Sequence, residues 1–113
     1  MLTIRPRTPE DDERIVAIRN AIHPDHMPLT VEEQRHSYER QPADAYFEMH
    51  VAERRGKIVG YATWSRQVYT VEENTYWTIL GVDPAHWGKG IGSALYEMML
   101  GNVRDRGARL LKC

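Results

Sequence analysis

The sequence predicts an α+β protein with strands and helices in the order β-α-α-β-β-β-α-β, and three features indicate this class. Residues 46–53 and 58–66 alternate apolar and polar side chains around a short turn at 54–57, which is typical of a β-hairpin. Residues 75–95 combine a strand rich in β-branched and aromatic residues, a glycine-rich turn and the start of a helix. Residues 10–22 repeat isoleucine at helical spacing.

The N-terminal part of the chain predicts a strand at residues 2–7 followed by a helix. Thr8 can cap this helix, and Pro9 suits its first turn because proline has no amide hydrogen to satisfy. Pro24 stops it. Its apolar stripe is formed by Ile15, Ile18 and Ile22.

A second helix is predicted to begin at Thr30, where Glu33 completes a capping box, and to end before Pro42. Its apolar face is poor, since Val31 and Tyr38 are its only large apolar side chains. We therefore expect this helix to lie on the protein surface.

A third helix is predicted to follow the glycine-rich turn and to end near Arg106, with Gly107 as its C-cap. Its apolar stripe is formed by Ile91, Leu95 and Met98. Residues 108–112 then begin another strand. We expect that strand to lie beside residues 75–82, because a helix joins the two as a right-handed crossover.

The composition is that of a small globular chain, whose 113 residues suit one domain over residues 1–113. A formal net charge of −1 gives no reason to expect nucleic acid or an anionic membrane as a partner. We find no apolar run that would span a bilayer and no signal-peptide core. Because Cys113 is the only cysteine, a disulfide framework and a cysteine-based zinc site are excluded. We expect a cytoplasmic protein without a metal site.

Residues 82–93 contain the most informative feature of the chain, because Gly88, Gly90 and Gly92 follow a strand and precede a helix. Glycine lets the backbone turn so that several N–H groups converge on one point. The start of a helix adds unpaired donors and partial positive charge. This combination predicts an anion site, for a phosphate or pyrophosphate. The alternative is a glycine-rich turn that only packs the helix onto the sheet.

Two common phosphate-binding motifs do not fit this segment. A Walker loop requires Gly-Lys followed by Ser or Thr, whereas Lys89 is followed by Gly90. A dinucleotide fingerprint requires G-x-G-x-x-G directly after a strand and an acidic residue about 20 residues later. Here residues 83–87 separate the strand from the glycines, the spacing is G-x-G-x-G, and residues 109–111 contain no acid.

The same segment resembles the acyl-CoA-binding motif of the GNAT superfamily of N-acetyltransferases, [RQ]-x-x-G-x-[GA] after a Val-x-Pro strand exit. Val82 and Pro84 match the exit, and Gly90 and Gly92 match the motif glycines. Trp87 stands at the Arg/Gln position and departs from the family pattern. The resemblance covers essentially the whole chain. It implies a mixed, mostly antiparallel central sheet flanked by helices, truncated here after the fifth strand.

The resemblance implies acetyl-CoA as the cosubstrate. Backbone groups of Leu80 and Val82 would pair with its pantetheine arm like an added strand, and Gly81 would suit a bulge that splays this strand from its neighbour. Backbone amides after the strand would bind the pyrophosphate. The residues expected there are Trp87, Gly88, Lys89, Gly90, Ile91, Gly92 and Ser93. The Lys89 side chain either adds a contact or is a solvated loop lysine.

Residues for proton transfer are harder to identify. In the resembling family a carboxylate often precedes the strand-exit valine on the same strand, but the corresponding positions here are Thr78 and Trp77. Glu73 and Tyr76 are the remaining catalytic candidates. Glu73 would act through water or belong to a solvated turn, and Tyr76 would line the acceptor pocket or pack in the core.

A full domain of the resembling family would continue past residue 113 with a helix that supplies a tyrosine as general acid, and with a final strand pair. We therefore expect a fragment, a domain completed by another segment or chain, or a homo-oligomer formed through an open strand edge. A natural short domain is the remaining alternative. The resemblance predicts acetyl transfer from acetyl-CoA to an unidentified amine acceptor, with little activity from this chain alone. The alternative function is a non-catalytic CoA-binding or assembly module of a larger or split protein.

Overall fold

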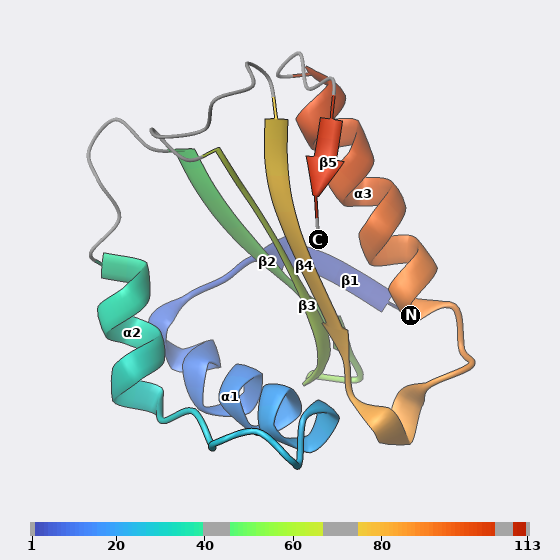
Figure 1. Cartoon of the computed structure of the whole chain (residues 1–113). Coiled ribbons are helices and arrows are strands. Elements are labelled where there is room, and N and C mark those ends of the chain that lie inside the picture. Colours follow the sequence, from blue (N-terminus) through green and yellow to red (C-terminus); the bar gives the residue numbers. More distant parts are fainter. Residues whose placement is uncertain (1, 40–45, 67–74, 106–109, 113) are drawn as a thin grey trace.

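The structure is a computed structural model that describes residues 2–39, 46–66, 75–105 and 110–112. Its strands form one sheet in the order β1-β2-β3-β4-β5, with helices on both faces (Figure 1). The strands are β1 (Leu2–Pro6), β2 (Tyr46–Arg54), β3 (Lys57–Arg66), β4 (Thr75–Val82) and β5 (Leu110–Lys112). The helices are α1 (Asp12–Ile22), α2 (Val31–Glu39) and α3 (Ile91–Asp105), with short 3-10 turns at Pro9–Asp11 and Pro84–His86. None of the described helices combines the length and apolarity needed to cross a bilayer.

The arrangement confirms the predicted α+β class and the predicted order of elements. Strands β1 to β4 pair antiparallel with their sequence neighbours, and β5 pairs parallel to β4. Helix α3 joins these two parallel strands and lies on one face of the sheet, whereas α1 and α2 lie on the other (Figure 1). The result is a mixed, mostly antiparallel sheet flanked by helices.

Each face of the sheet has its own buried cluster. The α3-face cluster contains Ala52, Val59, Ala62, Trp64, Tyr76, Val82, Ile91, Leu95, Met99 and Val103. The α1-face cluster contains Ile15, Ile18, Met49, Val51, Ile58 and Tyr61. The predicted stripe of α3 needs one correction, because Met99 is buried whereas Met98 lies at the margin, half-buried. The helix turns every fourth residue from Ile91 to Val103 toward the sheet.

The side chains of β3 also depart from simple alternation between the two faces of the sheet. Simple alternation would place Val59 on the same face as Tyr61. In the structure Val59 packs in the α3-face cluster and Tyr61 in the α1-face cluster. The cause is a β-bulge, since successive residues of β2 pair with Ile58 and with Gly60. Val59 is therefore the extra residue of the bulge, and strand alternation changes phase there.

The helix starts agree in part with the sequence pattern. The predicted capping box of α2 is confirmed, since the Thr30 N–H donates to Glu33 Oε1 and the Glu33 N–H donates to Thr30 Oγ1, each at 3.1 Å. The first helix begins differently, because a 3-10 turn at Pro9–Asp11 precedes α1. The Thr8 N–H donates to Asp11 Oδ2 at 2.8 Å and closes that turn.

A buried ion-pair network holds α1 and α2 against β1. Asp12 is fully buried and pairs with Arg7, which follows β1. Asp12 Oδ2 also accepts a hydrogen bond from the Nε of Arg35 in α2, at 3.1 Å. Because a buried charge is stable only when it is paired, this network fixes where α2 lies on the α1 face.

Candidate functional site

The loop after β4 is anchored by one carboxylate. Asp83 Oδ1 accepts from the Ala85 N–H at 3.1 Å, and its other oxygen pairs with Arg14 of α1. Arg14 also donates from Nε to the Ile58 carbonyl at 2.9 Å. Burial by itself would raise the pKa of Asp83, but the Ala85 amide and the Arg14 guanidinium outweigh it and lower that pKa below its ordinary value. The ionised Asp83 therefore fixes the loop to α1 and β3.

Two glycines of this loop adopt a backbone conformation that other residues avoid. Gly88 and Gly90 have φ values of 79° and 78°. No described atom lies within 4 Å of a Cβ added at either position, so conformation rather than crowding requires glycine. The Ala94 N–H donates to the Gly90 carbonyl at 3.1 Å, which marks the start of α3. The first N–H groups of a helix have no partner within it, and here they form a cradle suited to an anion.

A cavity of about 430 Å³ lies between this helix start and the end of β4. It is lined by all the predicted cofactor-binding residues except Lys89, namely Leu80, Val82, Trp87, Gly88, Gly90, Ile91, Gly92 and Ser93. The exception, Lys89, lines a neighbouring cavity instead. The structure therefore brings the predicted residues together in one site.

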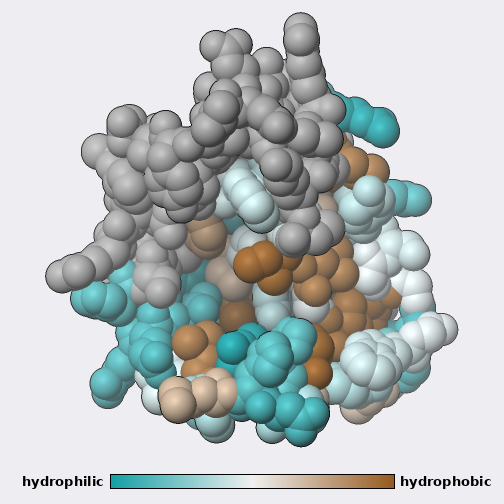
Figure 2. Space-filling model, in the orientation of Figure 1, coloured by the Kyte–Doolittle hydropathy of each residue, from teal (hydrophilic) through white to brown (hydrophobic). Residues whose placement is uncertain are grey.

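No described strand pairs with the edge of β4 beside this cavity. Within the described residues, β5 pairs with β4 only from Thr75 to Trp77, so β5 does not cover the end of β4. Figure 2 shows hydrophobic atoms gathered over β4 and beside α3. Ile79 is 61% exposed and Leu80 is 37% exposed, which is unusual for aliphatic strand residues. This edge is suited to pair with an extended ligand.

Trp87, which departs from the family motif, has a defined structural role. Its ring is largely exposed, but its indole N–H donates to the Val82 carbonyl at 2.8 Å. The side chain therefore ties the glycine loop to the end of β4. The sequence pattern did not reveal this contact, because any indole donor could have pointed to solvent.

Gly81 has a role that the sequence pattern did not predict. The β3–β4 register runs past Gly81 without a shift, so the expected bulge is not present between these strands. Instead, a Cβ on Gly81 would lie 2.6 to 2.8 Å from atoms of the Tyr61 ring. Glycine is required there because Tyr61 packs directly on the β4 backbone.

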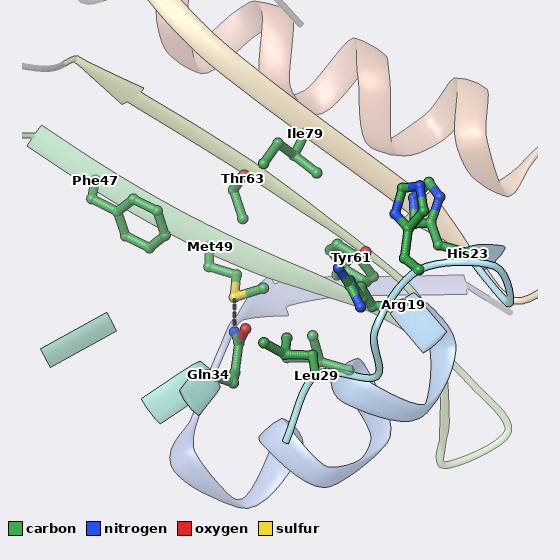
Figure 3. Close-up of a pocket in the computed structure, with 11 residues that line it drawn as sticks. Arg19, His23, Leu29, Gln34, Phe47, Met49, Tyr61, Thr63 and Ile79 are labelled. Carbon is green, nitrogen blue, oxygen red and sulfur yellow. Dashed lines mark hydrogen bonds between the residues drawn. The ribbon is translucent and has the colours of Figure 1, made fainter. Parts of the chain in front are cut away.

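A second cavity, of about 390 Å³, lies on the α1 face (Figure 3). Its lining is mostly apolar, with a few polar groups from α1, α2 and the segment between them. The lining residues are Ile15, Arg19, His23, His26, Leu29, Gln34, Phe47, Met49, Tyr61, Thr63 and Ile79. Tyr61 packs against Gly81, which lines the first cavity, so these two residues lie between the two cavities. Sequence reasoning did not identify this cavity, since its residues come from separate elements.

Tyr61 and Arg19 are two of the polar groups that line the α1-face cavity. Burial raises the pKa of Tyr61, and the nearby charge of Arg19 opposes that shift, so the phenol stays protonated at neutral pH. Arg19 donates to the Met27 carbonyl at 3.0 Å and to Asn20 Oδ1 at 3.1 Å. No described carboxylate pairs with Arg19 or lines this cavity.

Neither catalytic candidate is among the described residues that line this cavity. Tyr76 is 2% exposed within the α3-face cluster, on the opposite side of the sheet from Tyr61. Glu73 lies outside the described residues. The position of Tyr76 favours the packing alternative, and the role of Glu73 stays a prediction.

The chain is similar to acetyltransferases in sequence and in structure. It is 30% identical over 105 residues to the mycothiol acetyltransferase of Segniliparus rotundus, and it spans only 39% of that protein while the match covers 88% of this chain. An N-acetyltransferase from Staphylococcus aureus Mu50 has a TM-score of 0.86 at 28% identity, over 98% of this chain and 71% of the other. A GNAT acetyltransferase from Brucella melitensis, solved with acetyl-CoA, has a TM-score of 0.74 at 26% identity, over 98% of this chain and 73% of the other.

The match to a family extends over nearly the whole chain. Residues 12–113 match the Acetyltransferase (GNAT) family, and this range includes the glycine loop and the residues that line both cavities. The chain therefore belongs to the GNAT acetyltransferase family, as its loop motif predicted.

Proposed function

We propose that this chain binds acetyl-CoA and acts as an N-acetyltransferase, or as the cofactor-binding part of one, which transfers the acetyl group to an amine. The observation that carries the proposal is the cavity that joins the open edge of β4 to the glycine loop at the start of α3. A solved relative that holds acetyl-CoA supports the identity of the ligand. The residues proposed to hold it are Leu80, Val82, Trp87, Gly88, Lys89, Gly90, Ile91, Gly92 and Ser93.

The two ends of this cavity suit two parts of the cosubstrate. The N–H groups at the start of α3, with the positive end of the helix dipole, suit the pyrophosphate. The edge of β4 at Leu80 and Val82 suits the amide groups of the pantetheine arm, which would extend the sheet. The Val82 carbonyl already accepts from Trp87, but a carbonyl oxygen can accept a second hydrogen bond. Acetyl-CoA supplies the activated thioester.

We propose that the α1-face cavity receives the amine. Attack on the thioester requires a neutral amine, and both apolar walls and the charge of Arg19 disfavour the protonated form of an amine bound there. The same features favour an amine with an apolar body over a polyamine, because Arg19 repels further positive charge. Tyr61, whose hydroxyl stays protonated, lines this cavity and lies beside Gly81 of the first cavity.

The alternative function is a non-catalytic CoA-binding or assembly module. It would use the same loop and cavity and would differ only in turnover. An acetylation assay over aromatic, aliphatic and polyamine acceptors distinguishes the two functions. Turnover that is highest with apolar amines supports the enzyme, and binding of acetyl-CoA without turnover in any acceptor class supports the module.

Calorimetric titration with acetyl-CoA tests the binding site. Ser93→Glu places a carboxylate in the first turn of α3, where it favours the helix but repels a bound phosphate. We expect the dissociation constant to rise by about tenfold or more. Gly101→Glu adds the same charge to an exposed position of the same helix and should leave the affinity unchanged. Unaltered affinity in a folded Ser93→Glu variant would refute the assignment.

A further inference from the structure

A third cavity, of about 340 Å³, is lined mainly by cations. Arg54 ends β2, Arg55 lies in the turn that follows, and Lys57 begins β3, whereas Lys89 comes from the glycine loop. The pairing of Gly60 with Val82 places that turn and the loop at the same end of the sheet (Figure 1). Residues far apart in the sequence thus converge on one basic hollow.

The cations of this hollow differ from four described arginines elsewhere in the protein. Arg5, Arg7, Arg14 and Arg35 all form ion pairs with carboxylates. Within the described part of the chain, by contrast, no carboxylate pairs with the arginines and lysines that line the hollow. Like charges held together repel one another, so an anion that enters the hollow relieves that repulsion.

The hollow adjoins the proposed pyrophosphate site. His86 lines both cavities, and Lys89 stands between the two loop glycines with positive φ. The Nδ1 atom of His86 is buried without a hydrogen-bond partner among the described residues, 3.5 Å from Asp83 Oδ2. A ligand whose pyrophosphate lies on the glycine loop would therefore carry a second phosphate into this hollow if that phosphate is attached nearby.

We propose that this basic hollow binds the 3′-phosphate of CoA and so makes the protein select CoA over dephospho-CoA. CoA carries this phosphomonoester on the ribose next to its pyrophosphate, and such a group has nearly two negative charges at neutral pH. Arginine and lysine are the side chains that bind phosphate through charge-assisted hydrogen bonds. The proposal rests on the proposed binding of acetyl-CoA to the glycine loop and adds a determinant of cofactor specificity.

The test compares the dissociation constants of CoA and dephospho-CoA by calorimetry. We expect the unmodified chain to bind CoA about tenfold more tightly, since several partly exposed ion pairs each add a small amount. High salt should shrink this preference, because exposed charges are screened. Lys57→Glu should weaken CoA binding and leave dephospho-CoA binding unchanged. Lys57→Gln should have a smaller effect of the same kind, which covers the case in which the glutamate variant does not fold.

Arg104→Glu is the matched control, because Arg104 is an exposed arginine in the last turn of α3, at the other end of that helix from the loop. It should leave the preference for CoA intact.

Equal affinity of the unmodified chain for the two nucleotides would overturn the proposal, while the glycine loop could still be the binding site. A Lys57→Glu variant that weakens both nucleotides equally would also overturn it. If inorganic phosphate binds the hollow while the protein shows no preference for CoA over dephospho-CoA, the hollow is a site for free phosphate and the proposal is overturned. Failure of both nucleotides to bind would refute the loop assignment and this proposal together.

Discussion

Replacement of Gly81 by alanine tests the packing of Tyr61 on β4, between the two cavities. The backbone of Gly81 does not have a positive φ, so alanine is compatible with its conformation. The added Cβ would instead lie 2.6 Å from Tyr61 Cζ and 2.8 Å from its hydroxyl oxygen. Atoms in ordinary contact are about 3.5 to 4.0 Å apart, so either the ring or β4 must move by about 1 Å.

The expected cost follows from how tightly the ring is held. Tyr61 is 5% exposed and packs with Ile15, Ile18 and Met49, so the ring can move only toward the α1-face cavity and only by giving up these contacts. Overpacking of this kind costs about 1 to 3 kcal/mol, and we expect Gly81→Ala to lower the free energy of unfolding by ~2 kcal/mol. Tyr61→Val should cost about 3 kcal/mol by itself, through loss of buried area and formation of a cavity.

Urea denaturation of the two single variants and the double variant measures the coupling between these positions. Because valine frees the space that the new Cβ needs, the double variant should be more stable than the sum of the single effects implies, by about 1 to 2 kcal/mol. Gly101→Ala, in an exposed part of α3 with no described atom within 4 Å of an added Cβ, should stabilise the protein by about 0.5 to 1 kcal/mol. A neutral Gly81→Ala, or additive effects of the pair, would refute the proposed contact.

Two further predictions concern single polar contacts. Trp87→Phe removes the donor to the Val82 carbonyl, so it should lower the free energy of unfolding by about 1 kcal/mol and weaken acetyl-CoA binding. Trp87→Gln retains an N–H donor and should preserve that binding. If calorimetry finds equal affinity in the two variants, the role of the indole N–H is contradicted. The hydrogen bonds from Arg5 lower the pKa of Asp11. The folded carboxylate therefore binds its proton less readily than the unfolded one, so it adds stability above pH about 4 that is lost as the pH falls through the folded pKa. Melting temperatures measured from about pH 2 to 7 should show a shallower loss on acidification for Asp11→Asn, and identical profiles would contradict this account.

Much of the local structure could be predicted because its causes lie within a few neighbouring residues. Thr30 and Glu33 form the capping box that their spacing predicts. Gly88 and Gly90 adopt the left-handed backbone that makes the loop, and the strand and helix on either side follow from hydrophobic periodicity. The order of the elements and the family motif are therefore properties of the sequence itself.

The pairing between distant segments decided the rest. The bulge at Val59 changes the face on which each β3 residue lies, and a shift of one residue in strand register cannot be seen in the sequence pattern alone. Only that register brings Tyr61 onto Gly81, and only the packing of α1 on the sheet brings Arg14 to Asp83. The cavities on the two faces, and the basic hollow beside the loop, arise from these long-range contacts. The sequence by itself thus determined the elements and the glycine loop, whereas the tertiary structure determined what surrounds that loop, because residues from separate elements meet only once the sheet has formed.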